Sequence, residues 1–177
     1  MTKGFIKKIF SLLAVLLLAP WPVAYAQSYN GDIAGQDAVR IEVAEASTTP
    51  IWTVFGRAIG GVSTPGDLFY IDATNNAADI QVTLYITNAQ ELIHCYRYLI
   101  LKVGVYVKSN GGEWERASRG NGETIPDTFI TMRNGRVSFT LPGYTKHKVT
   151  IDSGSFYCFT IKGNGGSFSP QFYLTVD

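Results

Sequence analysis

Residues 98–108 read YLILKVGVYVK, and this stretch decides the fold. Every second residue from Leu99 to Val107 is Leu or Val, and the alternate positions from Ile100 to Lys108 include both lysines. Successive side chains of a strand point to opposite faces of its sheet, so a period of two predicts a β-strand with one face in a core. We expect it to be a central strand.

Residues 79–87, DIQVTLYIT, show the same alternation and predict a second strand with one buried and one solvated face. The next residues change the pattern, because Asn88 and Glu91 have the spacing of a capping box. We therefore expect one or two helical turns over residues 89–95, begun by the Asn88 side chain.

Turn signals divide the remaining chain into short segments. Five Asn-Gly dipeptides begin at Asn30, Asn110, Asn121, Asn134 and Asn164. Asn134-Gly135 predicts a hairpin between residues 127–133 and 136–141. Further candidate strands cover residues 38–46, 51–59, 68–74, 113–117, 148–152, 155–162 and 171–176, with a turn at 61–66. About ten short strands indicate an all-β fold, an antiparallel β-sandwich or jelly roll with at most one short helix near 89–95.

The first 26 residues have the features of a secretion signal. Lys3, Lys7 and Lys8 precede eleven uncharged residues, and small residues end the segment at Ala24 and Ala26. We predict cleavage before Gln27, which gives residues 1–26 as signal peptide, 27–37 as a flexible N-terminal arm and 38–177 as one β-sandwich domain. An uncleaved N-terminal anchor is the alternative.

Composition and net charge limit the classes of partner that the chain can bind. The 177 residues are 46% hydrophobic and only 16% charged, which excludes a disordered chain. Three of the 15 basic residues and none of the 14 acidic ones lie in the signal, so the mature chain carries a net charge of −2. We expect a secreted, extracellular or cell-surface protein that binds neither nucleic acid nor, after cleavage, a membrane.

Cys95 and Cys158 would meet an oxidising compartment after export. We predict a disulfide between them, with two buried free thiols as the alternative. Their spacing has no metal-site pattern.

No catalytic constellation is evident in the sequence. His94 and His147 have no metal-ligand spacing, and His147, between two lysines, reads as a solvated turn residue. Glu113 and Glu115 flank Trp114 and could serve a secreted hydrolase, but a charged edge strand explains them better. We therefore predict a non-enzymatic protein without a cofactor, and an unrecognised hydrolase remains the last alternative.

Two kinds of binding site are candidates. A loop with oxygen ligands could hold calcium, although it lacks the EF-hand spacing. Its residues are Asp72, Asn75, Asn76 and Asp79. Aromatic residues on the polar sides of strands could stack on sugars, or could simply cover the sheet. The candidates for this glycan site are Trp114, Tyr85, Tyr98 and Tyr106.

Residues 64–67, Thr-Pro-Gly-Asp, are followed by a strand through Ile71, the Asn75-Asn76 turn and the alternating strand to Thr87. Over about 25 residues this order resembles camelysin/TasA-type biofilm-matrix fibre proteins. The resemblance implies a jelly-roll subunit that polymerises when the N-terminal segment of one subunit completes the sheet of the next.

The N-terminal segment offers residues for such an exchange. Val39, Ile41 and Val43 could enter a neighbour's groove as an added strand, or could pair within their own sheet. We expect a cell-surface or matrix subunit that assembles with itself or with other surface proteins, with a carbohydrate-binding module as the alternative.

Overall fold

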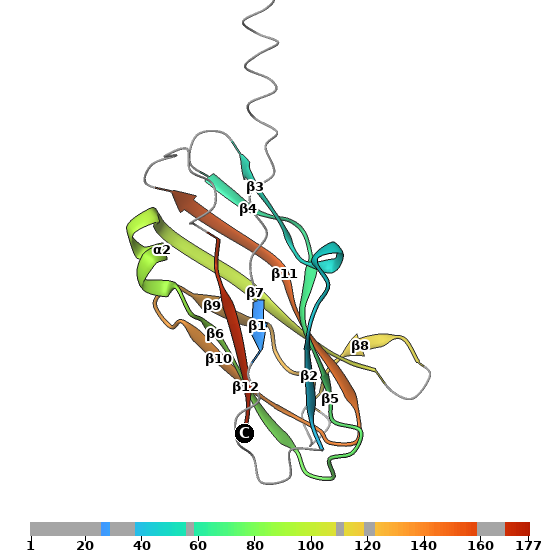
Figure 1. The fold of residues 1–177 in the computed structure, drawn as a ribbon. Helices are drawn as coiled ribbons and strands as arrows, with labels where there is room; N and C mark the ends of the chain where they lie inside the picture. The colour runs from blue at the N-terminus through green and yellow to red at the C-terminus, as the bar shows by residue number, and fades with distance from the viewer. Residues whose placement is uncertain (1–25, 29–37, 56–58, 109–111, 119–122, 159–168) are drawn as a thin grey trace, which may run out of the picture.

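The computed structural model describes residues 26–28, 38–55, 59–108, 112–118, 123–158 and 169–177. They form an all-β fold of two sheets with one α-helix (Figure 1). The predicted signal peptide and N-terminal arm lie outside the described residues, except for residues 26–28. No helix in the described ranges is long and apolar enough to cross a membrane.

The smaller sheet has four strands in the order β1-β12-β6-β10. These are β1 (Ala26–Ser28), β12 (Phe172–Val176), β6 (Ile80–Ile86) and β10 (Arg136–Leu141). β12 and β10 pair antiparallel to β6, whereas β1 runs parallel to β12 at the edge (Figure 1).

The larger sheet has eight strands arranged around β11 (Lys146–Cys158). β7 (Tyr96–Lys108) pairs with β11 along nearly its whole length. On the other edge of β11, β5 (Gly66–Asp72) pairs with its first half and β4 (Ile59–Thr64) with its last residues. The outer strands are β2 (Arg40–Val43) beside β5, β3 (Ile51–Phe55) beside β4, and both β8 (Trp114–Arg116) and β9 (Thr128–Thr131) beside β7.

One apolar core lies between the sheets and contains residues from both. Val82 and Leu84 of β6 and Leu174 of β12 enter it from the smaller sheet, and Leu101 of β7 and Ile151 of β11 enter it from the larger one. The predicted alternation of β7 is confirmed, because Leu99, Leu101, Val103 and Val105 are buried whereas Ile100 and Lys108 are exposed.

The predicted helix is confirmed as α2 (Ala89–Cys95), but its predicted cap is wrong. The buried Asn88 side chain makes no capping bond. It donates to the carbonyl of Ser169 and accepts from the amide of Gln171, at 2.9 Å each. Asn88 therefore ties the helix start to the segment before β12.

The predicted hairpin at Asn134-Gly135 is also wrong. β9 pairs with β7 in the larger sheet and β10 pairs with β6 in the smaller one, so this turn joins the two sheets. Gly135 has φ +57, the conformation expected of glycine in such a turn. The other four Asn-Gly dipeptides lie outside the described residues.

Two further predictions need correction. The predicted turn at 61–66 is instead the end of strand β4 (59–64) and the start of β5. The predicted segments 148–152 and 155–162 belong, as far as Cys158, to the single strand β11. The strand continues through Gly154, where a Cβ would lie 2.6 Å from the end of the Leu101 side chain, so glycine allows β11 to pack closely there.

A short 3₁₀ turn, η1 (Ala46–Thr48), connects β2 to β3.

Candidate functional site

Two rows of polar and aromatic side chains cross five strands of the larger sheet, on the face turned away from the core. Their alignment follows from the strand register across β2, β5, β11, β7 and β8. The first row is Arg40, Asp72, Lys146, Lys108 and Trp114, and the second is Glu42, Tyr70, Lys148, Tyr106 and Arg116. We call these ten residues the polar face.

Two aromatic rings lie over the Lys148 ammonium at the centre of the polar face, and a third ring, Tyr70, lies beside one of them. Its Nζ lies 5.3 Å from the Trp114 ring and 5.4 Å from the Tyr106 ring. The Trp114 and Tyr70 rings are 6.2 Å apart, and the Lys108 Nζ lies 5.8 Å from the Trp114 ring. These contacts are within the range of cation–π and tilted aromatic interactions, so they fix the Trp114 ring against β5 and β11.

Asp67 completes this cluster. Its carboxylate accepts from Lys148 at 3.0 Å and from the Tyr70 hydroxyl at 2.7 Å. The Lys148 and Asp67 side chains are only 18% and 16% exposed, which makes the ion pair part of the packed surface. Burial, followed by the bond to Asp67, raises the pKa of Tyr70.

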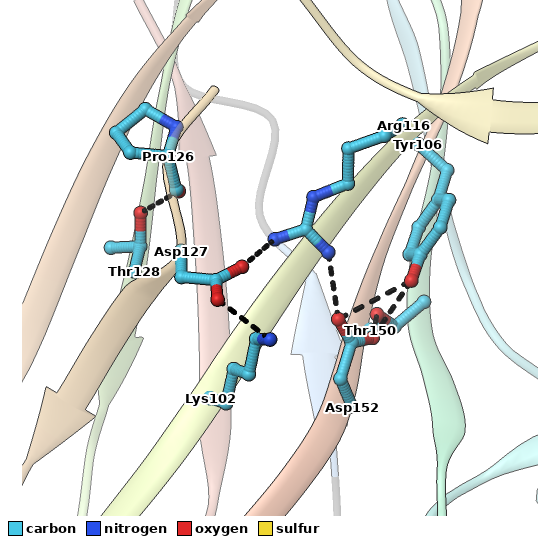
Figure 2. Close-up of polar contacts among 8 residues, drawn as sticks. All are labelled: Lys102, Tyr106, Arg116, Pro126, Asp127, Thr128, Thr150 and Asp152. Atoms are coloured by element: carbon cyan, nitrogen blue, oxygen red, sulfur yellow. Dashed lines mark hydrogen bonds and ion pairs between the residues drawn. The ribbon is translucent and has the colours of Figure 1, made fainter. Parts of the chain in front are cut away.

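A second network lies beside the first, around Arg116 of β8 (Figure 2). The guanidinium donates to Asp152 at 2.8 Å and to Asp127 at 3.0 Å. Lys102 also pairs with Asp127, at 2.8 Å, and its hydrogen bond lowers the pKa of that carboxyl. Burial disfavours the charged guanidinium, but the bonds to Asp152 and Tyr106 outweigh it and raise the pKa of Arg116.

Gly104 makes room for this network. A Cβ at Gly104 would lie 2.3 Å from the Asp152 carboxylate and 2.4 Å from the Thr150 hydroxyl. Because Gly104 has no Cβ, Asp152 can accept hydrogen bonds from Thr150 at 2.6 Å and from Tyr106 at 3.2 Å (Figure 2). The glycine in the alternating stretch of β7 is therefore a packing requirement of the polar face.

A surface hollow of about 300 Å³ lies at one end of the polar face. It is lined by Arg40, Glu42, Tyr70, Ile71, Asp72, Trp114, Lys146 and His147. Ion pairs stand along it: Arg40 with Glu42 at 3.1 Å, and Lys146 with Asp72 at 2.9 Å. Each pair places hydrogen-bond donors beside acceptors at the edge of an aromatic surface.

Asp72 is held in its charged form. The Thr74 hydroxyl donates to it at 2.6 Å, and this bond together with the Lys146 contacts lowers the pKa of Asp72 to about 2. Of the predicted calcium ligands, Asp72 pairs with Lys146, and the Asn76 side-chain amide donates to the Ala78 carbonyl. Across the described ranges, no three His, Cys, Asp or Glu side chains are grouped as metal ligands.

His147 is not the solvated turn residue that its lysine neighbours suggested. It lies in β11 and is fully buried, because alternation points it inward while Lys146 and Lys148 point out. Its Nε2 lies 2.9 Å from the Pro142 carbonyl and 2.7 Å from the Thr145 hydroxyl. Nδ1 has no hydrogen-bond partner among the described residues, and burial lowers the pKa of the imidazole.

The four aromatic residues predicted for a glycan site fall in three places. Trp114 and Tyr106 share the polar face. Tyr85 lies on the smaller sheet, 6.2 Å from Tyr173, and Tyr98 stacks on Tyr157 near the other end of β7, at 6.3 Å. Tyr70 joins Trp114 and was missed, although its position between the buried Phe69 and Ile71 is a period-two signal.

Glu113 and Glu115 are exposed, and β8 pairs only with β7 among the described strands, which fits a charged edge strand.

The proposed exchange strand pairs within its own sheet. β2 lies antiparallel to β5, with Ile41 opposite Ile71 and Val43 opposite Phe69. Val39 and Ile41 pack against the core, and Val43 is 42% exposed. This is the alternative in which the segment with Val39, Ile41 and Val43 pairs within its own sheet and does not enter a neighbouring subunit.

Cys95 is a free, half-buried thiol in this structure, in contrast to the predicted disulfide. The side chain of Cys158 lies outside the described residues, so the pairing itself stays a prediction. The Cys158 backbone lies opposite Tyr96, the immediate neighbour of Cys95.

In the comparisons with known proteins, no family model matches the chain and no curated protein matches it.

Proposed function

We propose that this protein is an exported, non-enzymatic β-sandwich that binds an extracellular glycan on the polar face of its larger sheet. The observation that carries the proposal is the Trp114–Tyr70 pair beside the hollow. Aromatic rings offer apolar surface to the C–H faces of a sugar, and the flanking ion pairs offer donors and acceptors to its hydroxyls.

The charges of the hollow favour binding over glycoside hydrolysis. A glycosidase needs one carboxyl group that stays protonated as the general acid. With a pKa of about 2, Asp72 is ionised throughout the neutral range and does not serve as that general acid.

The test is glycan-array binding followed by titration of the mature chain with each hit. We expect Trp114→Ala and Tyr70→Ala to weaken binding at least about tenfold, because truncation of an aromatic anchor commonly costs more than about 1.4 kcal/mol. Tyr85→Ala, on the other sheet, is the matched control. Intrinsic fluorescence gives a second readout, since Trp114 and the buried Trp52 are the tryptophans after Gln27.

Equal affinity of Trp114→Ala and the wild-type chain, or the absence of any glycan hit, would reject the proposal.

A second candidate is a self-assembling surface or matrix subunit, as the fibre-protein resemblance implies. It is favoured by β1, which lies at the edge of the smaller sheet immediately at the predicted mature N-terminus. The predicted cleavage removes Ala26, and the remaining edge residues, Gln27 and Ser28, contribute few bonds and could be supplied by another subunit. Exchange of this kind builds open filaments.

Electron microscopy and light scattering of residues 27–177 test this candidate beside a chain that begins at Asp37. The shorter chain lacks β1 but keeps β2 in its own sheet. We expect filaments from the longer chain alone. Monomers from both chains, or filaments from both, would contradict exchange of the N-terminal strand.

A further inference from the structure

Apolar side chains cover the opposite end of the outer face of the larger sheet. Strand register places Ile59, Tyr157 and Tyr98 in one row across β4, β11 and β7. Ile100 follows two residues along β7, and Phe129 of β9 lies opposite Lys102. We call these five residues the apolar patch.

The patch is exposed in the single chain. Tyr98 is 39% exposed, Ile100 42%, Phe129 49% and Ile59 52%. Together these side chains present on the order of 400 Å² of surface to solvent, comparable with the largest patch of a typical monomer, which is often functional. The Tyr98 and Tyr157 rings are stacked at an interplanar angle of 25°, so Tyr157 adds a second aromatic ring to the patch beside Tyr98.

The charge of Lys102, which lies opposite Phe129 of the patch, is neutralised by an ion pair. Lys102 is paired with Asp127 at 2.8 Å, and the mature chain has a net charge of only −2. Two copies therefore approach without strong repulsion. A patch of aromatic and aliphatic residues with a polar rim is the usual composition of an interface core.

The area fits a second copy of this chain. A stable interface buries roughly 800 Å² on each partner, and its apolar core is about half of that or a little more. A flat patch across four strands can meet its own copy about a two-fold axis, as sheets pack face to face about 10 Å apart.

We propose that the apolar patch is the contact surface of a two-fold symmetric homodimer. The contact is separate from the glycan-binding polar face and from exchange of β1. It closes on itself, so it yields a dimer and not a filament.

Sedimentation and light scattering of residues 27–177 over a concentration series test the dimer. Ile100→Lys places a charge in the centre of the patch, and we expect it to raise the dimer dissociation constant at least about tenfold. Ile51→Lys is the matched control, because Ile51 is 54% exposed at the outer strand β3, outside the patch. Phe129→Glu is the second variant, since its carboxylate would face Lys102 and keep the strand pair favourable.

A wild-type chain that stays monomeric up to about 1 mM overturns the proposal. So does equal weakening of the dimer by Ile51→Lys and the patch variants. If another part of the same chain covers the patch, both patch variants lower the melting temperature of a monomer, which also overturns it. Glycan binding by Ile100→Lys and filament formation are measured in parallel. The outcome for the dimer can then be distinguished from the outcomes for glycan binding and for filament assembly.

Discussion

His147 combines full burial with one nitrogen that lacks a partner among the described residues. Protonation of Nδ1 would create a buried N–H without an acceptor and a charge in the core, which is costly. The folded pKa is therefore below the ordinary 6.5, and the unfolded chain takes up the proton first as the pH falls. The stability is complete above about pH 6.5 and decreases below it.

We predict that the free energy of unfolding falls between pH 7 and pH 5 by at most about 1.4 kcal/mol per pH unit from this group. Urea unfolding at several pH values measures it. His147→Gln should remove the dependence, whereas His94→Gln, at an exposed position, should retain it. An unchanged pH dependence in His147→Gln would contradict the assignment. Asp72 does not contribute to the pH dependence between pH 7 and pH 5. Its contribution to the free energy of unfolding is lost only as the pH falls below about 4 towards its folded pKa of about 2.

At the scale of single elements, local sequence patterns were sufficient to locate β6, β7 and α2: a period of two for the strands, and the Asn88–Glu91 spacing for the helix, although Asn88 does not cap it. Their bounds are 80–86, 96–108 and 89–95, against predicted ranges of 79–87, 98–108 and 89–95. Strand partners were not predictable in the same way. Asn134-Gly135 correctly predicts a turn. The strands on either side of it do not pair with each other, because β9 pairs with β7 and β10 pairs with β6, which are distant in sequence.

The same distinction explains the polar face. Trp114 and Tyr106 were predicted as aromatic residues on the polar sides of their strands, but the cluster around Lys148 depends on register. A bulge shifts the β5–β11 register so that Val149 pairs with Phe69 and Thr150 with Asp67. The extra residue, Leu68, lets Asp67 and Tyr70 bind each other from one face, although strict alternation would separate residues three apart.

At the scale of the whole molecule, Cys158 ends β11, and Cys95 ends α2 immediately before β7, the strand that pairs with β11. Paired residues of antiparallel strands have Cα atoms about 4.5–5.5 Å apart, and Cys158 is paired with Tyr96, so the chain brings the two cysteines into the same region of the fold. Burial, followed by the charge of Glu91, raises the pKa of the Cys95 thiol, so its thiolate is scarce at neutral pH and oxidation is slow.

We predict that the natively exported protein contains a Cys95–Cys158 bond that contributes roughly 4 kcal/mol, as the chain-entropy model gives for a loop of this length. Mass spectrometry after alkylation, with and without reduction, detects it. Reduction should lower the melting temperature of the wild-type chain but not that of Cys95→Ser. Two alkylated cysteines in the unreduced exported protein would show that both thiols are free.

The central position of β11 also governs when the chain can fold. β4, β5 and β7 all precede β11 in sequence, and each pairs with it. During synthesis these strands must wait for residues 146–158 to emerge, and β12 completes the smaller sheet later still. Long-range pairing of this kind is slow. We therefore expect the larger sheet to stay incomplete while the chain is still being made, which is compatible with the predicted export of an unfolded chain through a translocation channel.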